Sequence, residues 1–176
     1  MKIFFTSDYH FYHNKDFIYE ARGFETVEDM VEEIIKTHNV MVGPDDDVYI
    51  LGDCMLNDNV RGLAALRRLN GKLHIIRGNH DTDERVELYK KLYNVVEVCD
   101  GKWLRYGKYN FYLSHLPCMT TSHGVRAKMY NIHGHTHSPD FQQYMNLGCY
   151  NVSVDAHAMQ PVPIDVIIED FKDYGF

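Results

Sequence analysis

The sequence predicts an α/β domain built on a mixed β-sheet. Over the first half of the 176 residues, short apolar runs of strand length alternate with segments of helical periodicity. Strand-like runs dominate the second half, and most of these runs end directly in polar side chains. No repeat, linker or change of composition divides the chain, so we expect a single domain over residues 1–176.

Three strands and three helices are expected to alternate in the first half. The strands are predicted at 2–6, 48–51 and 73–76, where short apolar runs stop at polar residues. The first helix is predicted to begin at Thr26, because Thr26 and Asp29 fit a capping box and the next apolar residues recur at helical spacing. Shorter helices are expected at 60–66 and 86–92.

The second half is predicted to consist mainly of strands. Gly107 and Lys108 form the expected turn between two of them. Segments 116–128 and 138–146 have the composition of loops. The predicted strands are 95–98, 103–106, 110–113, 130–132 and 151–154.

Composition argues against several classes of protein. Lys and Arg number 18 against 25 Asp and Glu, a net charge of −7, so the chain has no overall attraction for a nucleic-acid backbone. No apolar run has the length of a transmembrane helix, and the N-terminus lacks the features of a signal peptide. We therefore expect a cytoplasmic protein without membrane contact, and the four unpaired cysteines are expected as reduced thiols.

Polar side chains that can hold a metal ion follow five of the strand-like runs. They are two carboxylates, one amide and four imidazoles: Asp8, His10, Asp53, Asn79, His115, His135 and His137. Ligands of α/β sheets bind beyond the carboxyl ends of strands, so these side chains are expected to converge. Such a mixed set suits Zn, Mn, Fe, Ni or Co. Seven ligands exceed the need of one ion and fit two ions, about 3.5–4 Å apart, that share a carboxylate.

In order, these segments resemble the calcineurin-like metallophosphoesterase superfamily, from residue 6 to about residue 154. The resemblance rests on Asp8-x-His10, Gly52-Asp53, Gly78-Asn79-His80-Asp81, His115 and Gly134-His135-Thr136-His137. Residues 7–14 and 113–117 also resemble a small bacterial and phage branch of this superfamily. The resemblance implies a four-layer α/β/β/α sandwich of two mixed sheets.

The resemblance also assigns roles to the residues. It implies a first metal held by Asp8, His10, Asp53 and His137, and a second held by Asp53, Asn79, His115 and His135. It implies that His80 acts at the leaving group and that Asp81 orients its imidazole. A His followed by Asp, and not needed as a ligand, is also chemically suited to proton transfer. The alternative role for Asp81 is that of a negative charge at a helix N-terminus.

One segment departs from the family pattern. Many relatives carry Asp, Arg and Gly after Gly-Asp, but this chain has Cys54, Met55 and Leu56, so the usual arginine is missing. The departure weakens an interpretation as a protein phosphatase. Candidate substitutes for the phosphate contact are His13, Arg77 and Arg126. The histidines expected in the core or in solvent are His38, His74, His123, His133 and His157.

The expected function is hydrolysis of a small phosphodiester or phosphomonoester by attack of a metal-bridging hydroxide. Two divalent ions are the expected cofactors, with Mn first and Fe, Ni, Zn, Co or Mg as alternatives. No cap domain fits this length, so an open site is expected.

A nuclease is the alternative, supported by the basic stretch from Arg61 to Arg77 and opposed by the net charge. A non-catalytic scaffold is disfavoured because every ligand and His80 are present. The sequence leaves the natural substrate and the oligomeric state open.

Overall fold

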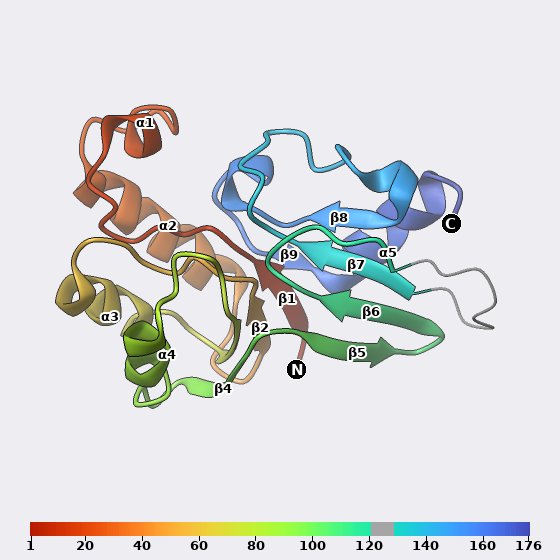
Figure 1. The fold of residues 1–176 in the computed structure, drawn as a ribbon, viewed down its shortest axis with the longest axis horizontal. Coiled ribbons are helices and arrows are strands. Elements are labelled where there is room, and N and C mark those ends of the chain that lie inside the picture. The colour runs from red at the N-terminus through yellow and green to blue at the C-terminus, as the bar shows by residue number, and fades with distance from the viewer. Residues whose placement is uncertain (121–128) are drawn as a thin grey trace.

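The computed structural model describes residues 1–120 and 129–176, and its strands form two β-sheets (Figure 1). The strands are β1 (Ile3–Thr6), β2 (Asp47–Ile50), β3 (Lys72–Ile76), β4 (Val95–Cys99), β5 (Lys102–Tyr106), β6 (Tyr109–Leu113), β7 (Met129–His133), β8 (Cys149–Asn151) and β9 (Val162–Pro163). The first sheet has the order β4-β3-β2-β1-β9, and only β9 runs antiparallel to its neighbour. The second has the order β5-β6-β7-β8, with β5 antiparallel and the other pairs parallel. Two mixed sheets with helices confirm the predicted fold class.

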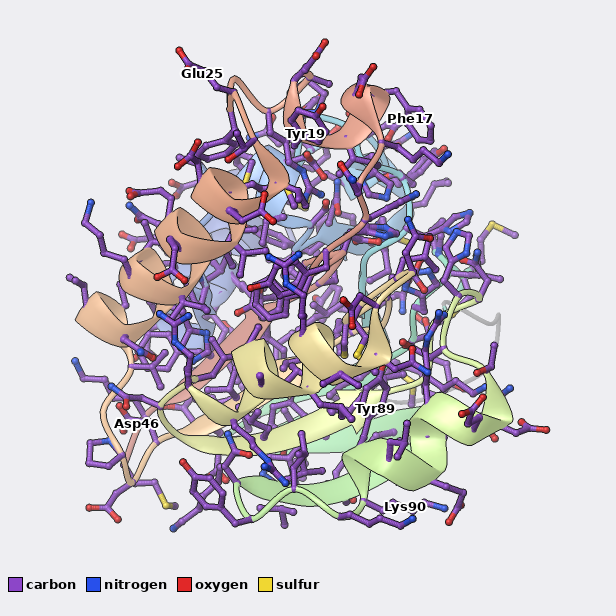
Figure 2. The ribbon with its side chains drawn as sticks, turned by 90° about the vertical axis from the view of Figure 1, so that its left-hand side faces the viewer. Phe17, Tyr19, Glu25, Asp46, Tyr89 and Lys90 are labelled. Atoms are coloured by element: carbon purple, nitrogen blue, oxygen red, sulfur yellow. The ribbon has the colours of Figure 1, made fainter. Side chains whose placement is uncertain are left out.

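Helices cover the outer face of the first sheet. The helices of the described residues are α1 (Asp16–Tyr19), α2 (Val27–Met41), α3 (Asn59–Arg67), α4 (Asp83–Tyr89) and α5 (Ile164–Asp173). Figure 2 shows α2, α3 and α4 in front of the first sheet, with α1 beyond one end of α2. The side chain of Thr26 accepts a hydrogen bond from the backbone N–H of Asp29 at 3.1 Å, which confirms the predicted cap.

Alternation along the first sheet divides the core into two clusters. Phe4, Val48 and Ile50 face α2 and α3, whereas Phe5 and Tyr49 point into the cluster shared with the second sheet and α5. The ring of Phe171 on α5 contacts aromatic side chains of the second sheet, with ring centroids 4.6 Å from Tyr130 and 5.8 Å from Tyr150. The two sheets are therefore fixed against each other by buried aromatic and aliphatic side chains.

Several elements differ from the prediction. The strand expected at 151–154 lies at Cys149–Asn151, and Val154–Ala156 forms a 3₁₀ turn instead. The helix expected at 86–92 begins earlier, because Thr82 caps it, and the loop at 138–146 leads into a 3₁₀ turn at Met145–Leu147. Helix α5 was not predicted, although its buried residues recur at helical spacing (Ile164, Ile167, Ile168 and Phe171). Two shorter elements, α1 and β9, were also missed.

The parallel pairs place five strand ends on one edge of the molecule. β1, β2 and β3 run in the same direction, and so do β6 and β7. Backbone hydrogen bonds join the loops that follow: Asp8 donates to Gly52 at 3.0 Å, and Gly134 donates to His115 at 3.0 Å. An isolated bridge between Ser7 and Ser153 links the two sheets at this edge. Within residues 1–120 and 129–176, no helix has the length and apolar character needed to cross a bilayer.

Candidate metal centre

The loops after β1, β2, β3, β6 and β7 bring all seven predicted ligands together. Two groups of side chains each place their ligand atoms within 4.8 Å of one another: Asp8, His10 and His137, and Asp8, Asp53 and His115. The side-chain oxygen of Asn79 lies 2.9 Å from Nε2 of His115 and 3.0 Å from Nδ1 of His135. The predicted convergence of strand ends is therefore present in the structure.

Asp53 lies between the two sets of imidazoles. Its Oδ2 is 3.7 Å from Nε2 of His10 and 3.4 Å from Nε2 of His115. Its Oδ1 accepts a hydrogen bond from the backbone N–H of His80 at 2.9 Å. This arrangement leaves one carboxylate oxygen directed at donors of both expected metal positions.

Asp8 presents a single free oxygen to the site. Its Oδ2 accepts hydrogen bonds from the hydroxyl of Ser7 at 2.6 Å and from the backbone N–H of His135 at 2.9 Å. Its Oδ1 is buried without a hydrogen-bond partner among the described residues and lies 3.6 Å from Nε2 of His137. A buried carboxylate oxygen without a donor is costly, and a cation would satisfy it.

The backbone at the ligands adopts an uncommon conformation. Positive φ angles occur at five of the seven: Asp8 (59°), His10 (49°), Asp53 (55°), His135 (70°) and His137 (48°). Residues with a side chain rarely occupy this left-handed region, and such strain clusters at functional sites. The loops after β1, β2 and β7 therefore carry their candidate ligands on left-handed backbone, a feature that the residue types do not reveal.

Glycines allow the ligand loops to approach one another. A Cβ at Gly134 would lie 2.6 Å from Oδ2 of Asp8, and one at Gly78 would overlap the carboxylate of Asp53. Neither position tolerates a side chain unless a ligand moves. The glycines beside the ligand residues are therefore required by close packing at the centre.

The electrostatics of the site favour a bound cation. Burial opposes a charge on His115, but the adjacent carboxylates of Asp53 and Asp8 raise its pKa to about 9. Burial likewise raises the pKa of Asp53, yet His115 and the backbone N–H of His80 lower it to about 2 overall. Burial and the neighbouring His137 lower the pKa of His10 to about 2, so this ring is neutral, as a ligand must be. The donor set of carboxylates, imidazoles and one amide oxygen thus fits divalent metal ions.

A second layer of contacts orients His137 and was missed by sequence reasoning. Nδ1 of His137 donates to Oδ2 of Asp155 at 2.8 Å, which leaves Nε2 directed at the site. Arg22 holds Asp155 through two hydrogen bonds of 2.8 and 2.9 Å, and the Arg22 side chain is only 3% exposed. A carboxylate behind a metal-binding imidazole fixes its tautomer and increases its basicity. The available signal was a carboxylate directly after the predicted strand 151–154; Asp155 lies within the 3₁₀ turn that replaced the end of this strand.

His80 lies at the rim of the site, and its predicted partner has a different role. The His80 side chain is 45% exposed, with Nε2 4.0 Å from Oδ2 of Asp53. Within the described residues, Asp81 makes no hydrogen bond to this imidazole. It accepts instead from the backbone N–H groups of Asp53 and Gly78 at 2.8 and 2.9 Å, and from the hydroxyl of Tyr89 at 2.7 Å. The expectation that Asp81 orients His80 is therefore corrected: Asp81 fixes the loop that carries Asp53.

The candidates for phosphate contact have different positions. His13 is nearly buried, with its ring 5.3 Å from that of His10. Arg77 lines a hollow beside Asn79 and His115, but its guanidinium is paired with the carbonyl of Asp81 and the carboxylate of Asp83. Arg126 and His123 lie outside the described residues. His133 packs against Tyr144 and is in neither ligand group, as strand alternation predicts.

Comparisons with known proteins identify the family of this chain. The model of the calcineurin-like phosphoesterase superfamily domain matches residues 1–154. An uncharacterized protein of Methanocaldococcus jannaschii is 34% identical over 174 residues, which cover 96% of this chain and 90% of that relative. A protein of unknown function from Aquifex aeolicus has a similar fold (TM-score 0.73, 24% identity, 96% of this chain and 98% of that chain). An archaeal phosphodiesterase is a more distant match (TM-score 0.51, 18% identity, 86% of this chain and 82% of that chain). The resemblance seen in the sequence is thereby confirmed, and the chain belongs to the calcineurin-like phosphoesterase superfamily.

Proposed function

We propose that the protein hydrolyses phosphoesters with two divalent metal ions as cofactors. The observation that carries the proposal is the convergence of seven metal-binding side chains around a carboxylate, Asp53, that faces both sets of imidazoles. The proposed first set is Asp8, His10, Asp53 and His137, and the second is Asp53, Asn79, His115 and His135. When bound, two such ions supply an activated water and neutralise charge on the phosphoryl oxygens.

Asp53 is proposed as the shared ligand because of its free oxygen. Oδ1 of Asp53 is occupied by the backbone N–H of His80, which fixes the plane of the carboxylate. Oδ2 is left between His10 and His115. Asp8 also has one free oxygen and is in both groups of clustered ligand atoms, so the shared role of Asp53 rests on the position of its Oδ2 between His10 and His115.

His80 is proposed to act on the leaving oxygen. Its backbone is fixed by two contacts, the N–H to Asp53 and the carbonyl to the guanidinium of Arg85. Its imidazole is free of hydrogen bonds to the described residues and is half exposed beside the ligands. A positioned imidazole in this place donates a proton to the departing alcohol or stabilises its charge.

A small diester or an accessible monoester is the proposed substrate class. The alternative, a nuclease, needs free basic side chains along the path of the strand. Three of the five basic residues of this stretch are paired with acidic side chains: Arg61 with Glu28, Arg68 with Glu32 and Arg77 with Asp83. These pairs support one substrate phosphate at the metal site and no extended nucleic-acid contact.

The test is a panel of substrates and metals. Purified protein loaded with Mn, Ni, Zn or Mg is assayed with p-nitrophenyl phosphate, bis-p-nitrophenyl phosphate, cyclic nucleotides and single-stranded DNA. We expect hydrolysis of a small ester, with Mn among the activating ions. Asp53→Asn is expected to lose bound metal and activity, while Asp173→Asn, an exposed change on α5, retains both. Full activity of the Asp53 variant would refute the shared ligand, and inactivity of the wild type with every metal and ester would refute the function.

A further inference from the structure

A cavity of about 650 Å³ lies beside the first set of ligands. His10, His137 and His80 line it, so it opens directly from the proposed reaction site. Its volume is within the range of about 300–1,000 Å³ found for small-molecule sites and exceeds what a phosphate group alone requires. The cavity therefore has room for the organic part of a phosphoester.

The charged residues of this cavity are already satisfied by protein contacts. Arg22 donates to both carboxylate oxygens of Asp155 and to the backbone carbonyls of Asp8 and Tyr9, at 2.8–3.2 Å. Asp155 also accepts from Nδ1 of His137 and from the hydroxyl of Ser153. Neither side chain has a free charge for a second phosphate or another ionic group of a ligand.

The remaining lining is apolar and aromatic. It comes from α1, the turn after it and two other loops: Phe17, Ile18, Ala21, Pro139 and Met159. Phe17 is 70% exposed and lies edge-to-face against His13, with ring centroids 5.6 Å apart and planes at 87°. The His13 ring is 5.3 Å from that of His10, so a series of rings leads from a ligand to the cavity mouth. In Figure 2, Phe17 and Tyr19 lie on opposite sides of α1, at one end of the molecule.

We infer that this cavity binds the alcohol part of the substrate and selects phosphoesters whose alcohol carries an aromatic ring. Phe17 is the specificity-determining residue, because its exposed face and the edge of His13 offer stacking contacts to a flat group. The inference rests on the proposed function, in which His80 acts on the leaving oxygen. Since His80 lines the cavity, the departing alcohol faces the rings.

The test uses two ligands that cannot be hydrolysed and differ only in the group on phosphorus. Binding of phenylphosphonate and methylphosphonate to the Mn-loaded protein is measured by calorimetry. We expect phenylphosphonate to bind about tenfold more tightly, from aromatic contact and apolar burial. Phe17→Ala should reduce this ratio to about twofold or less, and Phe17→Trp should retain it. Trp103→Ala is the matched control, because Trp103 is another exposed aromatic residue, 64% exposed, outside the cavity.

Each outcome separates the cavity assignment from the proposed function. Equal binding of the two phosphonates, absence of binding, or an unchanged ratio in Phe17→Ala would overturn the cavity assignment, even where the enzyme hydrolyses simple esters. If the binding ratio falls as much in Trp103→Ala as in Phe17→Ala, the cavity assignment would be overturned as well. If the ratio of phenylphosphonate to methylphosphonate binding depends on Phe17 but the protein hydrolyses no ester, the result would support the cavity assignment and refute the proposed function.

Discussion

The buried imidazole of His38 on α2 is expected to make the stability of the protein depend on pH, and replacement by glutamine should remove this contribution. The carbonyl of Asn70 can only accept a hydrogen bond, so Nε2 of His38 donates to it at 2.9 Å. Nδ1 is then an acceptor for the hydroxyl of Tyr9 at 2.7 Å. Burial raises the pKa of Tyr9, which therefore remains a donor. The hydrogen bonds fit the neutral imidazole, and a second proton would displace the Tyr9 contact.

The magnitude follows from the difference in pKa between the two states. Burial lowers the pKa of His38 from 6.5 to about 4 in the folded protein. The unfolded state therefore binds more protons below pH 6.5, and stability falls with decreasing pH until the folded pKa is reached. Between about pH 7.5 and about pH 5, this single group should reduce the free energy of unfolding by about 2 kcal/mol. Above about pH 7 its contribution is constant.

Urea unfolding at the two pH values measures this difference. Other histidines also titrate in this interval, so the informative quantity is the pH-dependent loss in the wild type minus the loss in His38→Gln. Glutamine has a donor and an acceptor but no titrating proton, so the variant should lose about 2 kcal/mol less than the wild type. An identical loss in both proteins would refute the reasoning.

Two substitutions test the metal centre, and the salt dependence of hydrolysis tests the substrate class. His80→Asn should reduce turnover by roughly 10²–10⁴-fold while metal content is retained. The reduction should be smaller for esters with good leaving groups, and an equal reduction for all esters would contradict a role at the leaving oxygen. Asp155→Asn should weaken metal binding by roughly 10–100-fold in a calorimetric titration, because His137 loses its charged partner; unchanged affinity would exclude this role. Hydrolysis of a small diester should change by less than about twofold between about 50 and 200 mM salt, whereas a protein tracking a nucleic-acid backbone would weaken by orders of magnitude. Steep salt dependence with faster cleavage of DNA would favour the nuclease.

The convergence of the seven candidate ligands could be predicted from the sequence because their chemistry and their position along the chain coincide. Each predicted ligand follows an apolar run, and the direction of parallel strands then requires that the ligands meet. The predicted role of Asp81 was wrong for the same kind of reason. Adjacency in the chain suggested a contact with His80, but the tight turn directs the two side chains apart and aims Asp81 at the N–H groups of Asp53 and Gly78.

Other features depend on contacts between distant segments. Arg22 reaches Asp155 across 133 positions of the chain, and no local pattern marks Arg22 as its partner. The positive φ angles at Asp8 and His137 cannot be read from the identity of these residues, and the close approach of Gly134 to Asp8 joins loops that are far apart in the chain. Helix α5 is different, because its apolar spacing was visible and could have predicted it.

Each proposed metal position combines candidate ligands from loops of both sheets. Asp8, His10 and Asp53 follow strands of the first sheet, whereas His137 follows the second; Asn79 and His115 are divided in the same way. Metal binding therefore requires the two sheets to be packed against each other in the folded arrangement. A metal that binds only the folded state stabilises this packing. At a concentration one hundred times the dissociation constant, one such ion would add about 2.7 kcal/mol to the free energy of unfolding. Backbone strain of about 1–3 kcal/mol at each left-handed ligand acts in the opposite direction. The buried aromatic and aliphatic side chains around Phe171 hold the two sheets together independently of any metal, so the side chains of the centre are brought to the junction of the two sheets by packing of the core.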